Sequence, residues 1–485
     1  MWQRLNLAWL IIAFVVLRLV SMIWVPLADT SEPRYAEIAR LMAVSNDWIT
    51  PYFEPGVPFW GKPPLSFWTQ AISFKIFGIN EFAARLPSLL ATLATAWMLW
   101  LFAMFSGGRR LAGYTAVIYG SGALVFVTAG AVLTDPFLVL GTTWSMAAFF
   151  LAPKHDSWFW RYGFFLGLAI GLLSKGPLAP VLTFGPIIIW LIQSPTRRVY
   201  ISALPWLKGL LLMLVISLPW YIAAELKTPG FLNYFIVGEH FMRFIDPGWS
   251  GDLYGNAHNQ PKGMIWPQWF VASFPWGLIA IAMLLWQLRA RQGRTLLKQS
   301  IKSPLVSYLL LWSVFTPLFF TFSGNILWTY VLPAIPAFTI LLALAIEHVG
   351  NLKPSLATNT LAASLVVPLV SVGLAIAVIV NPDLHKSEKG LIEFVEQDKA
   401  GRALGDAGPD KIYYLYNLPF SARFYSHGSA EEISFQELTG RQSPSQAMYV
   451  AIRPRNWSQV TANVPYDIEK RYENGRHILA ELPAL

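Results

Sequence analysis

LAWLIIAFVVLRLVSMIWVPL, residues 7 to 27, is an apolar run interrupted by one charged residue, Arg18. About 20 such residues in a helix cross the roughly 30 Å hydrocarbon core of a bilayer. The run is too long for the core of a signal peptide, and it lacks a small-x-small cleavage site. It therefore predicts a first transmembrane helix that stays attached to the chain.

Comparable runs recur along most of the chain, which has 485 residues, 55% of them hydrophobic and only 13% charged. This composition, with a mean hydropathy of +0.47, is typical of a membrane protein. Ten further apolar runs lie near residues 82–105, 111–131, 133–152, 161–174, 177–193, 203–224, 265–287, 304–322, 327–347 and 357–380. The sequence predicts an all-α polytopic membrane domain of about eleven transmembrane helices over residues 1–380.

The formal net charge of +9 lies in short clusters of Lys and Arg between apolar runs, whereas a nucleic-acid-binding protein gathers such charge on one face. The clusters fall on alternate sides of successive spans, and positive loops face the cytoplasm. They are Arg109-Arg110, Lys154 to Arg161, Arg197-Arg198, Arg289 to Lys302 and Lys353. We expect a cytoplasmic N-terminus and no nucleic-acid partner. The chain has no cysteine, which excludes disulfides and thiol nucleophiles.

On the opposite side lie the first loop, residues 28–80, a second large loop, 225–264, and the tail from Asn381. In the first loop, Pro33 to Ala43 and Pro63 to Phe77 have helical spacing and predict two interfacial helices.

The tail, residues 381–485, mixes structural types. Residues 390–400 have the pattern of a helix, and residues 412–416 and 448–452 have that of strands. Asn474-Gly475 between alternating segments indicates a hairpin. We expect a small soluble α/β domain outside the cytoplasm.

The first candidate acids follow the first span. Asp29 and Glu32 are spaced so that both carboxylates can face one space, and such a pair suits proton abstraction or metal binding. Alternatively, Glu32 and Glu37 only cap and balance the charge of the helix that starts at Pro33, paired with Arg34 and Arg40. The sequence leaves both interpretations open.

Asp135, in Thr134-Asp135-Pro136, separates two apolar runs at the outer interface. An ionisable group so placed indicates function. The alternative is a helix-initiating residue, since Asp is common at an N-cap before proline. We favour a functional role.

Two cations in the outer loops are candidates for phosphate binding. Lys62 lies in the rigid turn Phe59-Trp60-Gly61-Lys62-Pro63-Pro64, and Arg243 lies between aromatic residues in the second large loop. Arginine can grip a phosphate with two parallel hydrogen bonds. Taken singly, each is more typical of a cation that snorkels to lipid phosphates.

The histidines of the second loop, His240 and His258, lie near Glu239 and Asp246 but lack the spacing of metal ligands. We expect structural or substrate-contact roles for them. Lys175 ends a predicted span, and the sequence around it lacks the glycine spacing of a P-loop.

Several motifs together resemble one family, the bacterial protein-O-mannosyltransferase-like group of polytopic glycosyltransferases, which includes the aminoarabinose transferases that modify lipid A. The resemblance covers residues 1–345. The motifs are Glu32-Pro33-Arg34-Tyr35-Ala36-Glu37-Ile38-Ala39-Arg40, Lys62-Pro63-Pro64, Asn80-Glu81-Phe82-Ala83-Ala84-Arg85-Leu86-Pro87, Asp135-Pro136-Phe137, Ser174-Lys175-Gly176-Pro177 and Tyr330-Val331-Leu332-Pro333.

The resemblance implies a GT-C fold and a glycosyltransferase of the bacterial inner membrane. It would move a sugar from a polyprenyl (undecaprenyl) phosphate carrier to lipid A or another envelope glycan or protein at the periplasmic face. The family motifs assign Asp29, Glu32 and Asp135 as catalytic carboxylates and Lys62, Arg243 and Tyr330 as ligands of the carrier phosphate. Further candidates for substrate contact are Arg34, Tyr35, Lys175 and His258.

The chain departs from the family at two positions. Ser31 replaces the acid that usually precedes Glu32, so Asp29 and Glu32 both remain candidates for the base. Gly61 replaces the acid that usually precedes the Lys-Pro pair, so no metal ligand is assigned, although a divalent cation remains open. A transporter or lipid flippase is the alternative function, but it would favour internal repeats and charges near the membrane midplane.

Overall fold

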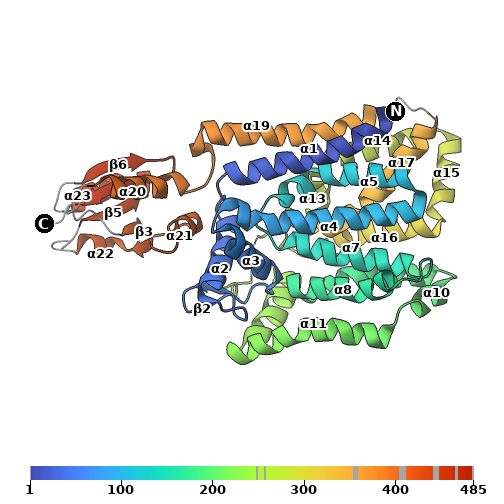
Figure 1. Cartoon of the computed structure of the whole chain (residues 1–485), viewed down its shortest axis with the longest axis horizontal. Coiled ribbons are helices and arrows are strands. Elements are labelled where there is room, and N and C mark those ends of the chain that lie inside the picture. Colours follow the sequence, from blue (N-terminus) through green and yellow to red (C-terminus); the bar gives the residue numbers. More distant parts are fainter. Residues whose placement is uncertain are drawn as a thin grey trace. The chain divides into compact units, whose positions relative to one another are not determined.

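The computed structural model describes residues 2–246, 249–255, 258–352, 359–402, 411–440, 447–464 and 468–482. Its internal contacts divide the chain into two units. The first comprises Met1–Met22 and Leu41–Val372, and the second comprises Ile23–Arg40 and Gly373–Leu485. The first unit is built mainly of helices, and the second contains a β-sheet with five strands in the described residues (Figure 1).

Each of the predicted apolar runs forms helix, at least over part of its length, so the all-α expectation is confirmed. The helices are α1 Trp2–Trp24, α4 Glu81–Gly107, α5 Arg109–Ser121, α6 Ala123–Ala129, α7 Asp135–Leu151, α8 Trp158–Lys175, α9 Leu178–Gln193, α11 Trp206–Lys227, α13 Ile265–Ala272, α14 Trp276–Arg289, α16 Pro304–Phe320, α17 Ile335–Leu352 and α19 Val366–Val380. Shorter α10 Arg197–Ser202 and α15 Arg291–Ile301 carry predicted cytoplasmic cations. Lys353 lies outside the described residues.

The number of complete spans stays a prediction. Within the described residues, five helices are long and apolar enough to cross a membrane, or eight if each of three bent pairs is one span. The bends follow from the sequence: α5 and α6 meet at Gly122 at 71°, and α13 and α14 are separated by Pro275 and meet at 99°. Two further apolar helices, α7 and α9, are shorter. The chain is a multi-pass membrane protein.

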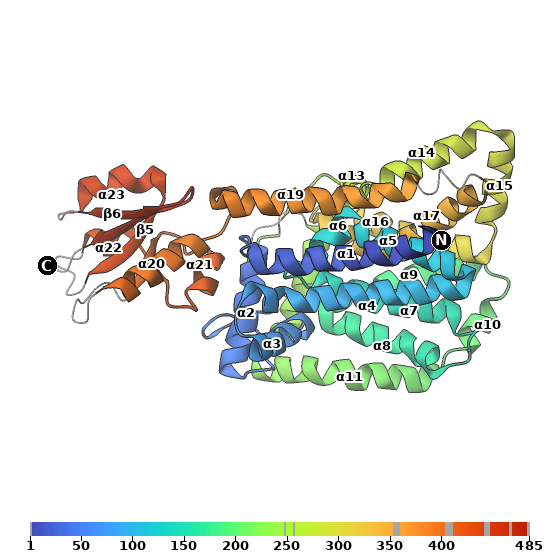
Figure 2. The same cartoon turned by 45° about the horizontal axis from the view of Figure 1, so that its top comes forward.

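Four helices, α4, α7, α8 and α11, lie side by side in that order in the first unit (Figures 1 and 2). Small residues allow α7 and α8 to approach closely, as is usual between helices in membranes. A Cβ added to Gly141 would lie 2.6 Å from the carbonyl oxygen of Gly167, and one added to Gly167 would lie 2.5 Å from that of Gly141. Any larger residue at either position would force the two helices apart.

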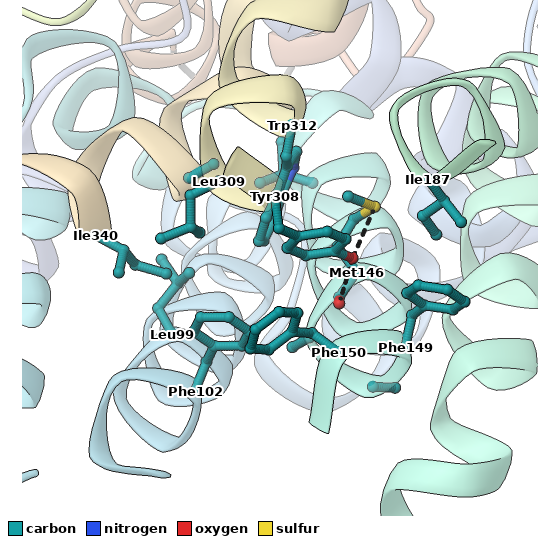
Figure 3. Close-up of a cluster of buried hydrophobic side chains, with 14 of the residues drawn as sticks. Leu99, Phe102, Met146, Phe149, Phe150, Ile187, Tyr308, Leu309, Trp312 and Ile340 are labelled. Carbon is teal, nitrogen blue, oxygen red and sulfur yellow. Dashed lines mark hydrogen bonds between the residues drawn. The ribbon is translucent and has the colours of Figure 1, made fainter. Parts of the chain in front are cut away.

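Aromatic side chains from α4, α7 and α16 meet in the core of the first unit (Figure 3). The ring of Tyr308 is fully buried and lies 5.0 Å from that of Phe150. Its hydroxyl donates a hydrogen bond of 2.8 Å to the carbonyl oxygen of Met146, on α7. This bond satisfies the polar end of a ring that is otherwise packed against apolar side chains, and so it ties α16 to α7.

The two large loops between the predicted spans also contain regular structure. The first loop contains β1 Tyr52–Glu54, β2 Val57–Pro58 and α3 Leu65–Phe77, and the segment around residue 40 forms α2 Ser31–Ser45. Both helices predicted for this loop are therefore present. The second loop contains η1 Asn233–Met242, a π-helix, and α12 Arg243–Ile245; η2 Trp328–Ala334 leads into α17.

The second unit is a small α/β domain, as the sequence predicts. Among the described residues its sheet has the order β4-β3-β5-β7-β6, in which β3 runs parallel to both neighbours and β7 antiparallel to both of its own. The hairpin expected at Asn474-Gly475 joins β6 to β7. The strands are β3 Ile412–Leu415, β4 Glu431–Ile433, β5 Met448–Ile452, β6 Glu469–Glu473 and β7 Ile478–Leu482; the helices are α20 Lys389–Gly401, α21 Phe420–Tyr425, α22 Phe435–Thr439 and α23 Trp457–Asn463.

Candidate functional site

The antiparallel hairpin of α7 and α8 brings together two of the predicted site residues. Asp135 begins α7 and Lys175 ends α8, so the two side chains meet at the same end of the hairpin. Lys175 Nζ lies 2.8 Å from Asp135 Oδ1, and each side chain is 9% exposed. Asp135 is the first residue of its helix, but its carboxylate engages Lys175, which is 40 residues away in the sequence.

The π-helix η1 supplies an acid that joins the two predicted phosphate-binding cations. Glu239 Oε2 lies 3.2 Å from Lys62 Nζ, and Glu239 Oε1 lies 3.0 Å from a terminal guanidinium nitrogen of Arg243. The same nitrogen lies 3.3 Å from Asp252 Oδ2. A π-helix is rare in proteins and is frequently found at functional sites. Lys62 and Arg243, far apart in sequence, are thus held by one carboxylate.

Glu239 is ionised in this setting. Burial opposes the charge of its carboxylate, but Lys62 and Arg243 outweigh burial and hold the pKa of Glu239 below its usual value. Two cations confined beside each other would repel, and the shared carboxylate offsets that repulsion. The cluster holds both cations beside the cavity described next.

A cavity in the first unit gathers these side chains in one place. Its lining combines charged and amide groups with apolar side chains and comes from four stretches of the chain, at residue 62 and within 175–181, 239–244 and 319–330. The lining residues are Lys62, Lys175, Pro177, Leu178, Val181, Glu239, His240, Arg243, Phe244, Phe319, Phe320, Ser323, Asn325 and Tyr330. The ring of Tyr330 lies 5.1 Å from Lys175 Nζ, within reach of a cation–π contact. The cavity therefore suits an anionic head group attached to an apolar chain.

The histidines of the second loop differ in role. His240 is half-buried, and its ring nitrogens lie 2.7 Å and 2.9 Å from the carbonyl oxygens of Phe235 and Lys175. It therefore fixes the end of α8 from which Lys175 projects. The His258 side chain is exposed, but its backbone N–H donates a 3.1 Å hydrogen bond to Asn325 in the cavity wall.

Asp29 belongs to the second unit, where its carboxylate is fully engaged. It accepts hydrogen bonds from the backbone N–H of Ser421 at 2.8 Å and from the Ser421 hydroxyl at 2.6 Å. Arg476 lies 2.7 Å from its second oxygen, and the Asp29 side chain is 4% exposed. These three contacts tie the segment after the first span to α21 and to the β6–β7 hairpin.

The remaining residues of the first-loop motif also lie in the second unit. Glu32 accepts a 3.2 Å hydrogen bond from the backbone N–H of Ala28, at the start of α2. Arg34 stacks over the ring of Tyr35 at 5.1 Å. Glu37 and Arg40, on the same helix, form a buried ion pair of 2.6 Å. The contact of Glu32 with Ala28 at the helix start and the pairing of Glu37 with Arg40 are both contacts that the capping and charge-balancing interpretation expects.

No metal site follows from these positions. Among the described residues, His, Asp and Glu side chains form no group of three that could hold a metal ion. Gly61, which precedes Lys62, carries no ligand atom in its side chain.

Two residues of the cavity, Glu239 and Asn325, were not assigned from sequence. Glu239 had a usable signal, because it precedes Arg243 by four residues and acid–base pairs at that spacing meet on a helix. The sequence contains no comparable signal for Asn325. This residue lies in an irregular loop after α16, and a hydrogen bond from the backbone of His258 holds it in the cavity wall.

The sequence is similar to those of known glycosyltransferases. Residues 61–222 match the model of the dolichyl-phosphate-mannose-protein mannosyltransferase family. The undecaprenyl phosphate-alpha-4-amino-4-deoxy-L-arabinose arabinosyl transferase of Shewanella sediminis is 31% identical over 350 residues, which is 70% of this chain and 60% of that protein. The same enzyme of Yersinia pestis is 31% identical over 375 residues, 73% of this chain and 62% of that protein. The chain thus spans about 60% of the length of these curated relatives.

Solved structures show the same fold. ArnT from Cupriavidus metallidurans bound to undecaprenyl phosphate is 18% identical, with a TM-score of 0.76 over 98% of this chain and 97% of that one. The archaeal oligosaccharyltransferase AglB from Archaeoglobus fulgidus is 11% identical, with a TM-score of 0.53 over 96% of this chain and 72% of that one. The relationship indicated by the sequence motifs is therefore confirmed: the chain is a multi-pass membrane protein of the GT-C fold, related to the aminoarabinose transferases and to the protein mannosyltransferase family.

Proposed function

We propose that this protein transfers a sugar from an undecaprenyl-phosphate carrier to lipid A or another envelope glycan or protein. The observation that carries the proposal is the single cavity in which Lys62, Lys175 and Arg243 meet beside an apolar wall. Cations suit the phosphate of such a donor, and the apolar wall suits the first part of its polyprenyl chain. The similarity to transferases that use the same carrier supports this assignment.

The proposed reaction breaks the bond between the anomeric carbon of the sugar and the phosphate oxygen. The phosphate keeps the bonding electron pair, an acceptor oxygen bonds to the anomeric carbon, and the acceptor proton passes to a carboxylate. Because negative charge grows on the phosphate, nearby cations lower the barrier. Lys62 and Arg243 have this role in the proposal, and Arg243 contributes a planar fork that matches a phosphate.

Asp135 is the proposed base. Its partner Lys175 lines the cavity, and Asp135 lies directly behind it at 2.8 Å. When Lys175 turns toward a bound phosphate, the Asp135 carboxylate loses its ion-pair partner and can accept a proton. Tyr330, beside Lys175, is the proposed third contact of the phosphate.

Asp29 and Glu32 remain candidates for the acid that assists transfer, as the family motif suggests. The Asp29 carboxylate already has three partners in the second unit, which favours a positioning role for it. Glu32, at the start of α2, is the other candidate. Arg34, Tyr35 and His258 are proposed as further contacts of donor or acceptor.

We propose that the cavity opens toward the periplasm and that residues 381–485 form a periplasmic domain after a transmembrane domain of residues 1–380. The alternating positive segments support a cytoplasmic N-terminus. The donor would then be used at the outer face of the bacterial inner membrane.

The test uses purified protein in vesicles, undecaprenyl-phosphate aminoarabinose as donor, and lipid A as acceptor. A glycosyltransferase forms modified lipid A and releases undecaprenyl phosphate in equal amounts, and Lys62→Ala should abolish both products. Lys227→Ala is the matched control, because Lys227 is also an outer-loop cation but pairs with Asp47 away from the cavity. A flippase would instead move labelled donor across the bilayer without cleaving it, and that result would replace the proposal. Mass spectrometry of envelope glycolipids from a deletion strain identifies the natural sugar and acceptor.

A further inference from the structure

Asn325 is a buried amide in the wall of the cavity. It lies in the loop between α16 and η2, and it lines the cavity together with Lys62, Lys175 and Arg243. Only 4% of the residue is exposed. A side-chain amide in this position has to find partners for both its oxygen and its nitrogen.

The oxygen of the amide has a partner, and this fixes its orientation. The backbone N–H of His258 donates to Asn325 Oδ1 at 3.1 Å. Only the oxygen of an amide can accept such a bond, so the NH₂ group has to occupy the other position. Asn325 Nδ2 is buried and has no hydrogen-bond partner among the described residues.

The loop that carries the amide is held on both sides. The backbone N–H of Gln260 donates to the carbonyl oxygen of Gly324 at 2.7 Å, and Asn259 pairs with Asn325 as an isolated bridge. The Ser323 hydroxyl lies 3.3 Å from the backbone nitrogen of Asn325. The amide is therefore held in advance in the geometry that a ligand would meet.

A buried NH₂ group without an acceptor is unfavourable, and it gains most from a ligand that supplies one. A second donor in the same cavity, Arg243 Nε, is also buried without a hydrogen-bond partner among the described residues. The neighbouring charges of Lys62 and Lys175 select an acceptor that is anionic or strongly polar. Oxygens of a phosphorylated sugar meet these conditions.

We propose that Asn325 is a donor-binding residue whose Nδ2–H donates a hydrogen bond to an oxygen of the donor head group, on the phosphate or on the sugar. The inference rests on the proposed function and adds a contact to it. Asn325 belongs neither to the family motifs nor to the group of charged side chains formed by Lys62, Glu239 and Arg243. A neutral amide adds directional recognition to the attraction that Lys62 and Arg243 supply.

The test is Asn325→Asp. The new side chain keeps an oxygen for the N–H of His258 but replaces the donor by a negatively charged acceptor. Loss of a hydrogen bond to a charged group, with added repulsion, should weaken binding by about tenfold or more. Binding of undecaprenyl phosphate and the KM of the glycosylated donor are both measured. Weaker binding of undecaprenyl phosphate assigns the contact to the phosphate, and a raised KM alone assigns it to the sugar.

Controls separate this role from a structural one. Asn46→Asp makes the same change on an exposed residue whose side-chain oxygen contacts Lys75, and it should leave binding unchanged. Thermal unfolding of Asn325→Asp should match the wild type. At acidic pH the variant should recover part of its affinity relative to the wild type, because a protonated carboxyl group is again a donor.

Two results would overturn the inference. Wild-type binding by Asn325→Asp would exclude the contact, and a defect confined to Asn325→Ala, which also loses the bond to His258, would assign Asn325 to the loop alone. Failure of the wild type itself to bind undecaprenyl phosphate or transfer a sugar would instead refute the proposed function, and this inference with it.

Discussion

The ammonium of Lys175 lies 2.8 Å from a carboxylate oxygen of Asp135, and both side chains are nine-tenths buried. Removing one partner of such a pair leaves a buried charge and typically costs about 3–5 kcal/mol. Any substitution of Asp135 therefore changes stability as well as chemistry. The two effects have to be measured separately.

Asp135→Asn should lower turnover by at least about 100-fold, because an amide keeps the shape of the side chain but cannot take a proton. The double variant Asp135→Asn/Lys175→Met should recover stability, since it removes both charges, and yet remain inactive. Single-turnover transfer and thermal unfolding of the wild type and both variants provide the measurement. Full activity of Asp135→Asn would exclude Asp135 as the base.

Arg243→Lys should weaken use of the donor more than the unchanged charge suggests. Lysine cannot reproduce the planar fork that contacts Glu239, and it offers a phosphate a single ammonium. We expect a KM for the donor raised by about tenfold, the effect of losing one charge-assisted hydrogen bond. Steady-state kinetics with purified polyprenyl-phosphate sugar measures it. Unchanged kinetics in both Arg243→Ala and Lys62→Ala would make these residues ordinary lipid contacts.

Glu239→Gln should destabilise the protein at neutral pH but not in acid. Lys62 and Arg243 hold the pKa of Glu239 below its usual value despite burial. The stability contributed by this carboxylate is therefore complete above about pH 4.3, the pKa of an unperturbed glutamate, and is lost as the pH falls below it.

Melting temperatures of the wild type and Glu239→Gln, measured across this range, should converge as the pH falls. Asp156→Asn is the control, because the Asp156 side chain is 88% exposed and pairs with Arg161 at the protein surface. A difference between wild type and Glu239→Gln that does not depend on pH would mean that the charge of Glu239 does not hold the two cations.

The helices were largely predictable from the sequence, but the contacts of the cavity were not. Hydrophobic runs of sufficient length predict helices locally, and the helices lie where the runs do. In contrast, Glu239 contacts Lys62 although the two residues are 177 positions apart in the sequence. Asn325 is held by a hydrogen bond from His258, which is 67 positions away. No periodicity in the sequence encodes such contacts, and Lys62 and Arg243 were assigned to one site from their shared predicted location and from the family resemblance.

Asp29 illustrates the same limit. Its position after the first span suggested a catalytic acid, and its partners, Ser421 and Arg476, lie more than 390 residues further along the chain. The sequence pattern of the tail predicted its strands but not that α21 and the β6–β7 hairpin enclose a carboxylate from the first loop.

Asp29→Asn and Arg476→Gln should destabilise the second unit through one shared interaction. A partly buried hydrogen bond to a charged group contributes about 1.5–3 kcal/mol, so the double variant should lose less than the sum of the single losses. The full chain is unfolded with denaturant, and unfolding of the second unit is monitored by proteolytic cleavage within residues 373–485. The losses of stability in the single and double variants give the coupling energy between Asp29 and Arg476. Strictly additive losses would show that the pair does not act as a unit.

Turnover of the Asp29→Asn variant then separates the two first-loop acids. We expect Asp29→Asn to lower turnover, because the segment that carries Asp29 would no longer be held in place. Glu32→Gln should also lower turnover. Near wild-type turnover by Asp29→Asn, together with an inactive Glu32→Gln, would assign the proton transfer to Glu32.

The orientation in the membrane can be tested by reporter fusions after Lys302 and after Lys386. The positive segment Arg289 to Lys302 predicts a cytoplasmic position for the first junction, and the tail predicts a periplasmic position for the second. A periplasmic reporter should therefore be active only at the second junction. Activity only at the first would reverse the topology and place the cavity on the wrong side for the proposed reaction.

The central claim is that the cavity holds the carrier phosphate between Lys62 and Arg243. A structure of the protein determined with bound undecaprenyl phosphate tests it most directly. The account predicts phosphate density within hydrogen-bond distance of Lys62 Nζ and of the Arg243 guanidinium group, with the polyprenyl chain leaving along the apolar wall formed by Leu178, Val181 and Phe319. Phosphate density elsewhere on the protein, with Lys62 and Arg243 still paired with Glu239, would contradict it.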